Sequence, residues 1–196
     1  MTNLYRAFTP DLEVRKGGDG RTIYGIAVPY NVEMRINAQL VEEFVPGSFG
    51  AQLRAIAAGR PASSMARFAR EHVELGGSII GATQLLRDDA AGLYGEWRAS
   101  KTPLGDETLE LVKDGGLSQL SIGFQEGQNR RLRSGTIQRV TARLFEVAVV
   151  MQGAYGDLAV AAGVRSAGDQ GAPAMPGLDE GWRILDGLPD LALPRL

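Results

Sequence analysis

Residues 115–124 read Gly-Gly-Leu-Ser-Gln-Leu-Ser-Ile-Gly-Phe, a glycine turn that leads into a short apolar segment typical of a β-strand. Side chains alternate between the two faces of a strand, which places Leu120, Ile122 and Phe124 on one buried face. Ser121 then lies on the opposite face, and the glycine two residues after it leaves room for another backbone or a ligand. The Ser121 hydroxyl is therefore either a candidate nucleophile or a structural serine hydrogen-bonded to its neighbours.

The composition is that of an ordinary globular protein. The chain has 196 residues, of which 44% are hydrophobic and 22% charged, and its net charge is −2. The absence of cysteine excludes disulfides, thiolate metal sites and cysteine nucleophiles. The charge offers no general attraction to nucleic acid or to anionic membranes. No apolar run approaches the roughly 20 residues of a membrane span, and we find no secretory signal, so we expect a soluble cytoplasmic protein.

Two further side chains stand out. His72 is the only histidine, so any serine–histidine chemistry must use it, although a single histidine is often a surface or structural residue. Glu146 is the one carboxylate in the apolar run 144–150. If it is buried it needs a partner or an altered pKa. Alternation instead allows an outward-facing position on an edge strand, on the same face as Leu144 and Ala148.

The rest of the chain predicts a mainly β fold with a few helices. The expected helices are 48–58, with Ser48 as the N-cap, and 103–114, with Thr102 as the N-cap and Pro103 at the first position. Residues 65–71 permit a helix or a strand, and 125–135 is expected to be an exposed hairpin loop. Besides the strand that holds Ser121, the expected strands are an irregular 4–16, then 22–28, 39–45, 78–86, 92–99 and 136–151.

This order of elements favours an antiparallel or mixed β-barrel with helices packed outside rather than a doubly wound sheet. Glycines in 16–21 predict a hairpin turn. We place the domain at 1–165, because the composition then shifts to Gly, Ala, Pro and Asp. Residues 166–196 are interpreted as a tail with one short helix at 178–185.

Ser121, His72 and Glu146 can form one catalytic device. Serine becomes a good nucleophile when a base accepts its proton, and imidazole is the side chain best suited to this at neutral pH. A carboxylate on the far imidazole nitrogen fixes the tautomer and stabilises the imidazolium. The separations in sequence predict that the three residues lie on different strands. This chemistry requires no cofactor and no metal ion.

Several short motifs occur in an order that resembles one protein family. They are Gly25-Ile-Ala27, Glu43-Phe-Val-Pro-Gly-Ser-Phe49, His72 followed by Ile80-Gly81, Asp89 followed by Gly92-Leu93, Thr102-Pro-Leu-Gly-Asp-Glu107, Leu120-Ser-Ile-Gly-Phe124 and Glu146-Val-Ala-Val-Val150. Over residues 20–162 the chain resembles the tailed-phage prohead proteases, which are capsid-maturation serine peptidases related in fold to herpesvirus assemblins. The family usually has Asn-His-Asp where this chain has Glu71-His72-Val73. It also has Ser and then Pro-Ala after the Glu-Val pair, where Ala148 and Gly153-Ala154 stand here.

The resemblance implies an assemblin-like β-barrel serine endopeptidase inside the immature capsid in the host cytoplasm. Ser121 matches the family's nucleophile, His72 its general base and Glu146 its third member. The implied partners are the scaffolding protein or the scaffolding segment of the major capsid protein, together with the protease itself. Because assemblins act as dimers, a homodimer or a higher homo-oligomer is a candidate assembly.

Two other functions are alternatives to proteolysis. A non-catalytic scaffold or capsid assembly protein could use the same fold, but retention of the serine, the histidine and the carboxylate favours the enzyme. A nucleic-acid-binding barrel would depend on Arg130, Arg131 and Arg133. Three arginines without flanking aromatic residues in an acidic chain are more typical of a solvated loop.

Overall fold

The computed structural model describes residues 3–8, 13–14 and 19–151. Within these residues the α-helices are α1 (Gly50–Ala57) and α2 (Pro103–Lys113), and two short 3₁₀ turns are η1 (Ala62–Ser64) and η2 (Val73–Leu75). The strands are β1 (Asn3–Phe8), β2 (Glu13–Val14), β3 (Thr22–Pro29), β4 (Met34–Arg35), β5 (Val41–Phe44), β6 (Arg67–Arg70), β7 (Ser78–Asp88), β8 (Gly92–Ala99), β9 (Gln119–Glu126), β10 (Asn129–Arg131), β11 (Ile137–Arg139) and β12 (Ala142–Val150).

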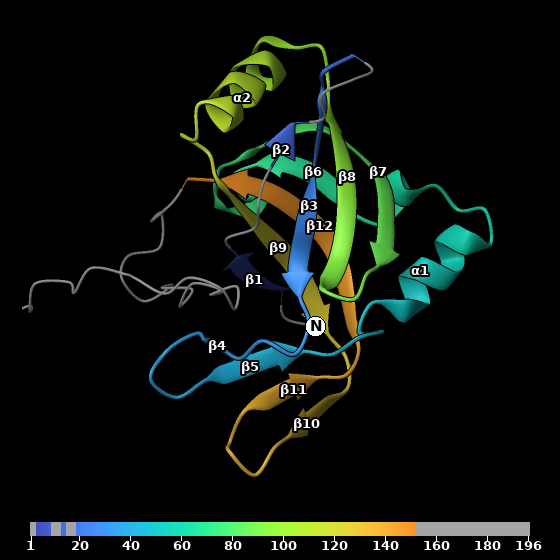
Figure 1. The fold of residues 1–196 in the computed structure, drawn as a ribbon, viewed down its shortest axis with the longest axis vertical. Coiled ribbons are helices and arrows are strands. Elements are labelled where there is room, and N and C mark those ends of the chain that lie inside the picture. The colour runs from blue at the N-terminus through green and yellow to red at the C-terminus, as the bar shows by residue number, and fades with distance from the viewer. Residues whose placement is uncertain (1–2, 9–12, 15–18, 152–196) are drawn as a thin grey trace, which may run out of the picture. The chain divides into compact units, whose positions relative to one another are not determined.

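Eight strands form one curled sheet, and four form a smaller one (Figure 1). The order in the large sheet is β1-β9-β12-β6-β7-β8-β3-β2, and in the small sheet it is β10-β11-β5-β4. Most neighbours are antiparallel, but β12 runs parallel to β6, and β11 to β5. The large sheet curls until β3 contacts β1 and β9 near its other end. The prediction of a mainly β, mixed barrel-like fold with helices outside is confirmed.

The strand β9 lies where its sequence predicts. Leu120, Ile122 and Phe124 have no exposed surface and pack in the core with Val147 and Val149 of the neighbouring strand β12. Burying side chains of this size contributes about 2 kcal/mol each before the entropy cost of folding. The opposite face of β9 is thereby left to Ser121.

The last predicted β segment, 136–151, is two strands rather than one. The chain turns at Val140 and Thr141, whose N–H groups both donate to the carbonyl of Gln128. This turn sends β11 into the small sheet and β12 into the large one. The expected loop 125–135 contains the end of β9 and strand β10, and the irregular first strand is two short strands, β1 and β2. Residues 65–71, whose sequence is compatible with a helix or a strand, contain strand β6.

Helix α1 is present, but Ser48 does not cap it. The N-cap is Phe49, with no side-chain hydrogen bond. The Ser48 hydroxyl is buried and lies 2.6 and 2.8 Å from the carbonyl oxygens of Val45 and Arg139, which share its single proton. Ser48 therefore ties the turn before α1 to the end of β11, a long-range contact that a local capping rule does not predict.

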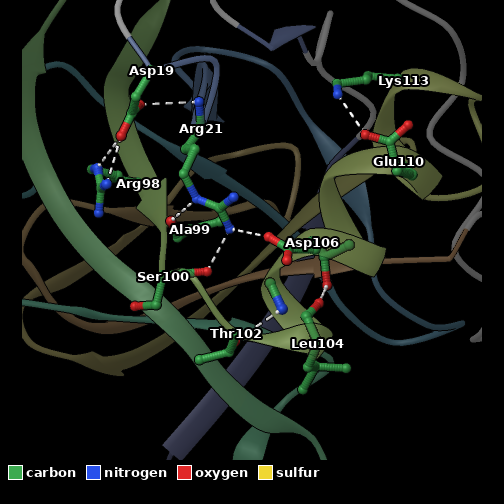
Figure 2. A network of polar contacts seen from close by, with 12 residues as sticks. Asp19, Arg21, Arg98, Ala99, Ser100, Thr102, Leu104, Asp106, Glu110 and Lys113 are labelled. Atoms are coloured by element: carbon green, nitrogen blue, oxygen red, sulfur yellow. Dashed lines mark hydrogen bonds and ion pairs between the residues drawn. The ribbon is translucent and has the colours of Figure 1, made fainter.

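Helix α2 begins as the sequence predicts and is tied to the sheet by charges. Thr102 accepts a hydrogen bond from the Gly105 N–H at 3.1 Å, and Pro103 occupies the first turn. Figure 2 shows Arg21 between α2 and the end of β8. The Arg21 guanidinium pairs with Asp106 at 2.6 Å and donates to the carbonyl of Ser100 at 2.5 Å.

A buried ion cluster joins the small sheet to β1 and β9. Glu42 of β5 is 1% exposed and accepts hydrogen bonds from Arg139 of β11 and Arg6 of β1. Both guanidinium groups lie over the ring of Phe124, and Arg139 also contacts Glu126. Because a buried carboxylate must be compensated, this cluster fixes how the two sheets meet.

Some expectations lie outside the described residues. These are the tail 166–196 with its helix at 178–185, the domain boundary at 165, and part of the turn 16–21. Within the described residues, no helix combines the length and apolar character needed to cross a bilayer.

We predict that Thr102→Ala lowers the free energy of unfolding by about 1 kcal/mol, because the Gly105 N–H loses its acceptor at the start of α2. Thr102→Ser keeps a hydroxyl at the same position and should remain close to the parent. Chemical denaturation of both variants measures the difference. Equal stabilities of the alanine and serine variants would contradict this role for the cap.

Candidate active site

Ser121, His72 and Glu146 form one continuous hydrogen-bonded chain. The Oγ atom of Ser121 lies 2.6 Å from Nε2 of His72, and Nδ1 of His72 lies 2.5 Å from Oε1 of Glu146. The three residues are 2%, 1% and 0% exposed, respectively. The sequence alone did not establish that they meet, and the structure brings all three together.

Ser121 lies on the middle of β9, which is paired with β1 on one side and with β12 on the other. Ala7 and Ala148 stand directly opposite it in the two ladders. Ala148, Ala69 and Val150 form a small apolar cluster separate from the main core. Because the neighbours on both sides are small, they do not block the contact between the Ser121 hydroxyl and the His72 imidazole.

The space beside Gly123 is filled by the protein itself. A Cβ atom on this residue would lie 2.7 Å from the ring of Phe145 and 3.1 Å from that of Tyr5. The expectation that this glycine leaves room for a backbone or a ligand is therefore replaced by a packing role. Glycine is needed because two aromatic rings cover this point of the strand.

His72 does not lie on a strand, in contrast to the expectation of three different strands. It follows β6 after Glu71 and precedes the turn η2. Glu71 has φ = 54°, in the left-handed region that costs most residues about 1 kcal/mol. This turn redirects the chain, and the His72 carbonyl then accepts the N–H groups of Leu75 and Gly77 at 2.8 and 2.9 Å.

Glu146 is buried on a central strand, so the alternative of an exposed residue on an edge strand is wrong. Strand β12 lies between β9 and β6. A β-bulge between Leu144 and Glu146 also breaks the alternation that grouped these two residues. Leu144 packs in the main core, whereas Phe145 and Glu146 both lie on the face of Ser121. The extra residue of the bulge is what brings Glu146 to this face.

Arg67 is the second partner of Glu146. It stands directly opposite Glu146 in the parallel pair of β6 and β12, and its Nε donates to Oε2 at 2.6 Å. Burial by itself raises the pKa of Glu146, but the hydrogen bonds from His72 and Arg67 outweigh burial and hold that pKa below its ordinary value. Glu146 is therefore a carboxylate at neutral pH.

The N-terminal strand covers the imidazole. The ring of Tyr5 lies 4.3 Å from that of His72, measured between centroids, at an angle of 54°. The Tyr5 hydroxyl donates to Glu74 in η2, and Asn3 donates to the same carboxylate at 3.0 Å. Burial and the bond to Glu74 raise the pKa of Tyr5, so its hydroxyl stays protonated. Strand β1 thus holds the turn that follows His72.

Sequence reasoning did not find Arg67, Tyr5 or Glu74. The position of Arg67 depends on the parallel register of β6 and β12, and 71 residues of chain separate the end of β6 from the start of β12. The alternation in Arg67-Phe68-Ala69-Arg70 does carry a signal, because a strand there puts Arg67 and Ala69 on one face. Tyr5 carried no comparable signal, since its partners lie far away in sequence.

A pocket of about 450 Å³ adjoins His72. Its wall includes the turn η2, with Leu75, and the start of α2, with Leu104. Arg70 also lines it and pairs with Glu107 at 2.7 Å. The side chain of Leu75 is largely exposed, so part of the apolar wall faces solvent. The pocket is large enough for a side chain of a bound peptide.

The arrangement of the site suits acyl transfer. A hydroxyl, an imidazole and a carboxylate in series are the parts of a serine nucleophile with its base and orienting group. Among the residues that the structure describes, no group of three or more histidine, cysteine, aspartate or glutamate side chains is arranged to hold a metal ion.

Comparison with known proteins places the chain in a family. The sequence model of the caudovirus prohead serine proteases matches residues 10–170. Among solved structures, the capsid assembly protease gp21 of bacteriophage T4 has a similar fold, with a TM-score of 0.54 and 12% identity over 76% of this chain and 96% of the other. No sequence among curated proteins matches significantly. The match covers most of the chain, which therefore belongs to the caudovirus prohead serine protease family.

Proposed function

We propose that this serine protease uses Ser121 as its nucleophile, His72 as its general base and Glu146 as the carboxylate that orients His72. The observation that supports this most directly is the unbroken series of two hydrogen bonds, at 2.6 and 2.5 Å, from the serine to the carboxylate. A scaffold protein on the same fold would have no need of a buried, charged acceptor behind a buried imidazole.

In the proposed mechanism, Nε2 of His72 accepts the proton of Ser121 as Oγ attacks the peptide carbonyl carbon. Nδ1–H of His72 donates to Oε1 of Glu146, which fixes the tautomer and stabilises the imidazolium. His72 then returns the proton to the leaving amine, and the acyl group remains on Ser121. Water, deprotonated by the same imidazole, releases the acyl group and restores the hydroxyl.

The substrates proposed are the scaffolding protein, the scaffolding segment of the major capsid protein and the protease itself, cleaved inside the prohead. The family match to prohead serine proteases supports this choice. We further propose that the pocket beside His72 receives a substrate side chain next to the scissile bond. Its wall contains His72 itself together with the apolar side chains of Leu75 and Leu104.

We predict that Ser121→Ala abolishes cleavage of co-expressed capsid protein and of the protease itself, since no other group can form the acyl intermediate. Loss of one buried hydroxyl beside alanines should leave the fold intact. Mass spectrometry of the co-expressed proteins, wild type against variant, measures the cleavage. Circular dichroism verifies the fold. Continued cleavage at the wild-type rate would exclude Ser121 as the nucleophile.

We predict that proteolytic activity falls as the pH is lowered from neutral, because imidazolium cannot accept the serine proton. The measurement is the initial rate of capsid-protein cleavage as a function of pH, at constant ionic strength. A thermal unfolding scan at each pH separates loss of activity from loss of structure. A flat rate profile over the range in which the protein stays folded would rule against His72 as the base.

We predict that Glu146→Gln, made in the Ser121→Ala background to prevent self-cleavage, lowers the free energy of unfolding by about 2 kcal/mol at neutral pH. The pKa of Glu146 is lowered in the folded state, so the unfolded state binds its proton more readily. The stabilisation is therefore present above the ordinary carboxyl range and is lost as the pH falls through it.

Denaturation at several pH values tests this. The stability difference between the parent and the glutamine variant should shrink as the solution is acidified. A difference that stays constant with pH would mean that the charge of Glu146 does not contribute to stability.

A further inference from the structure

We propose that Arg67 is a positioning residue of this protease: it anchors one oxygen of Glu146 so that the other faces His72. The inference rests on the roles proposed above for Ser121, His72 and Glu146. It adds a fourth residue, supplied by β6, on which the alignment of the imidazole depends.

The carboxylate of Glu146 is divided between two donors. Oε1 of Glu146 faces Nδ1 of His72 at 2.5 Å, and Oε2 accepts from Nε of Arg67 at 2.6 Å. With each oxygen assigned to one donor, the carboxylate cannot rotate about its last torsion without breaking a bond. Since Glu146 has no exposed surface, water does not replace a lost partner.

Arg67 is itself held in place. Its backbone is fixed opposite Glu146 by the parallel ladder, so its position does not depend on a loop. Its guanidinium carbon lies 5.7 Å from the ring centre of Phe145, the extra residue of the bulge. On its outer side, Nη2 lies 3.6 Å from Glu74. Because three separate contacts hold Arg67, it can fix the orientation of the Glu146 carboxylate.

The charge of Arg67 also affects the imidazole. The charged and titratable groups around Glu146 and His72 include Arg67 from β6, Glu74 from η2 and Tyr5 from β1. Arg70 and Glu71 also line the pocket beside His72. Arg67 and a protonated His72 would share a single buried carboxylate. Removing the guanidinium leaves the whole negative charge of Glu146 to the imidazolium, which is then easier to form. Arg67 thus keeps the base available at lower pH.

The test measures nucleophile reactivity without a peptide substrate. A fluorophosphonate probe is added to the purified full chain, and labelling is followed from about pH 5 to about pH 9. In this reaction Oγ of Ser121 forms a bond to phosphorus, fluoride leaves, and His72 takes the proton. The variants are Arg67→Met, which removes the cation and the donor, and Arg67→Lys, which keeps a cation without the planar donor group.

For Arg67→Met we expect labelling at neutral pH to be about tenfold slower, and the acid limb of the pH profile to move up by about one pH unit. For Arg67→Lys we expect slower labelling with the acid limb close to that of the wild type. The matched control is Arg98→Met on β8, which removes a cation paired with Asp19 at 2.5 Å (Figure 2), a pair that includes no residue of the triad. Arg98→Met should change neither the labelling rate at neutral pH nor the position of the acid limb.

The possible failures are distinguishable. A purely structural Arg67 would alter the unfolding temperature or the rate, but it would not move the acid limb, so an unmoved limb in a folded Arg67→Met variant overturns the proposal. If that variant does not fold, a wild-type rate and limb in Arg67→Lys overturn it. If the wild type is not labelled, or if Ser121→Ala is labelled equally, the proposed function itself fails.

Discussion

The central constraint on this structure is a carboxylate with no exposed surface in the middle of a sheet. An ion in such a place is tolerated only where hydrogen-bond donors replace its water. Glu146 finds its two donors in Arg67 and His72, which enter from one strand and from the turn that follows it. The parallel pairing of β6 with β12 and the left-handed turn at Glu71 are the backbone features that bring them there.

Distant parts of the chain complete the site. Strand β1 packs Tyr5 against the imidazole and binds the turn η2 through Glu74. On the other face of β1, Arg6 joins the buried cluster around Glu42. One short strand therefore takes part in both charged centres of the domain, one on each face of the sheet. The candidate active site and the contact between the two sheets therefore both depend on β1.

The sequence predicted what depends on local pattern. The alternation of Leu120, Ile122 and Phe124 and the capping of α2 by Thr102 needed only neighbouring residues, and both are confirmed. Residue chemistry singled out Ser121, His72 and Glu146 as candidates and the family resemblance implied a role for each, but spacing alone could not show that they meet.

The failures share a physical cause, which is that long-range contacts override local rules. Ser48 was expected to cap α1, but its hydroxyl instead hydrogen-bonds to the carbonyl of Arg139 at the end of β11. Glu146 was grouped with Leu144 by strict alternation, and one additional residue in β12 separates them. The bulge also has a consequence for how such enzymes can diverge. In a strand without the bulge, alternation would place either Phe145 or Glu146 on this face, but not both. The extra residue lets both side chains contact the Arg67 guanidinium. An insertion or a deletion in β12 would therefore disrupt this contact as surely as a substitution.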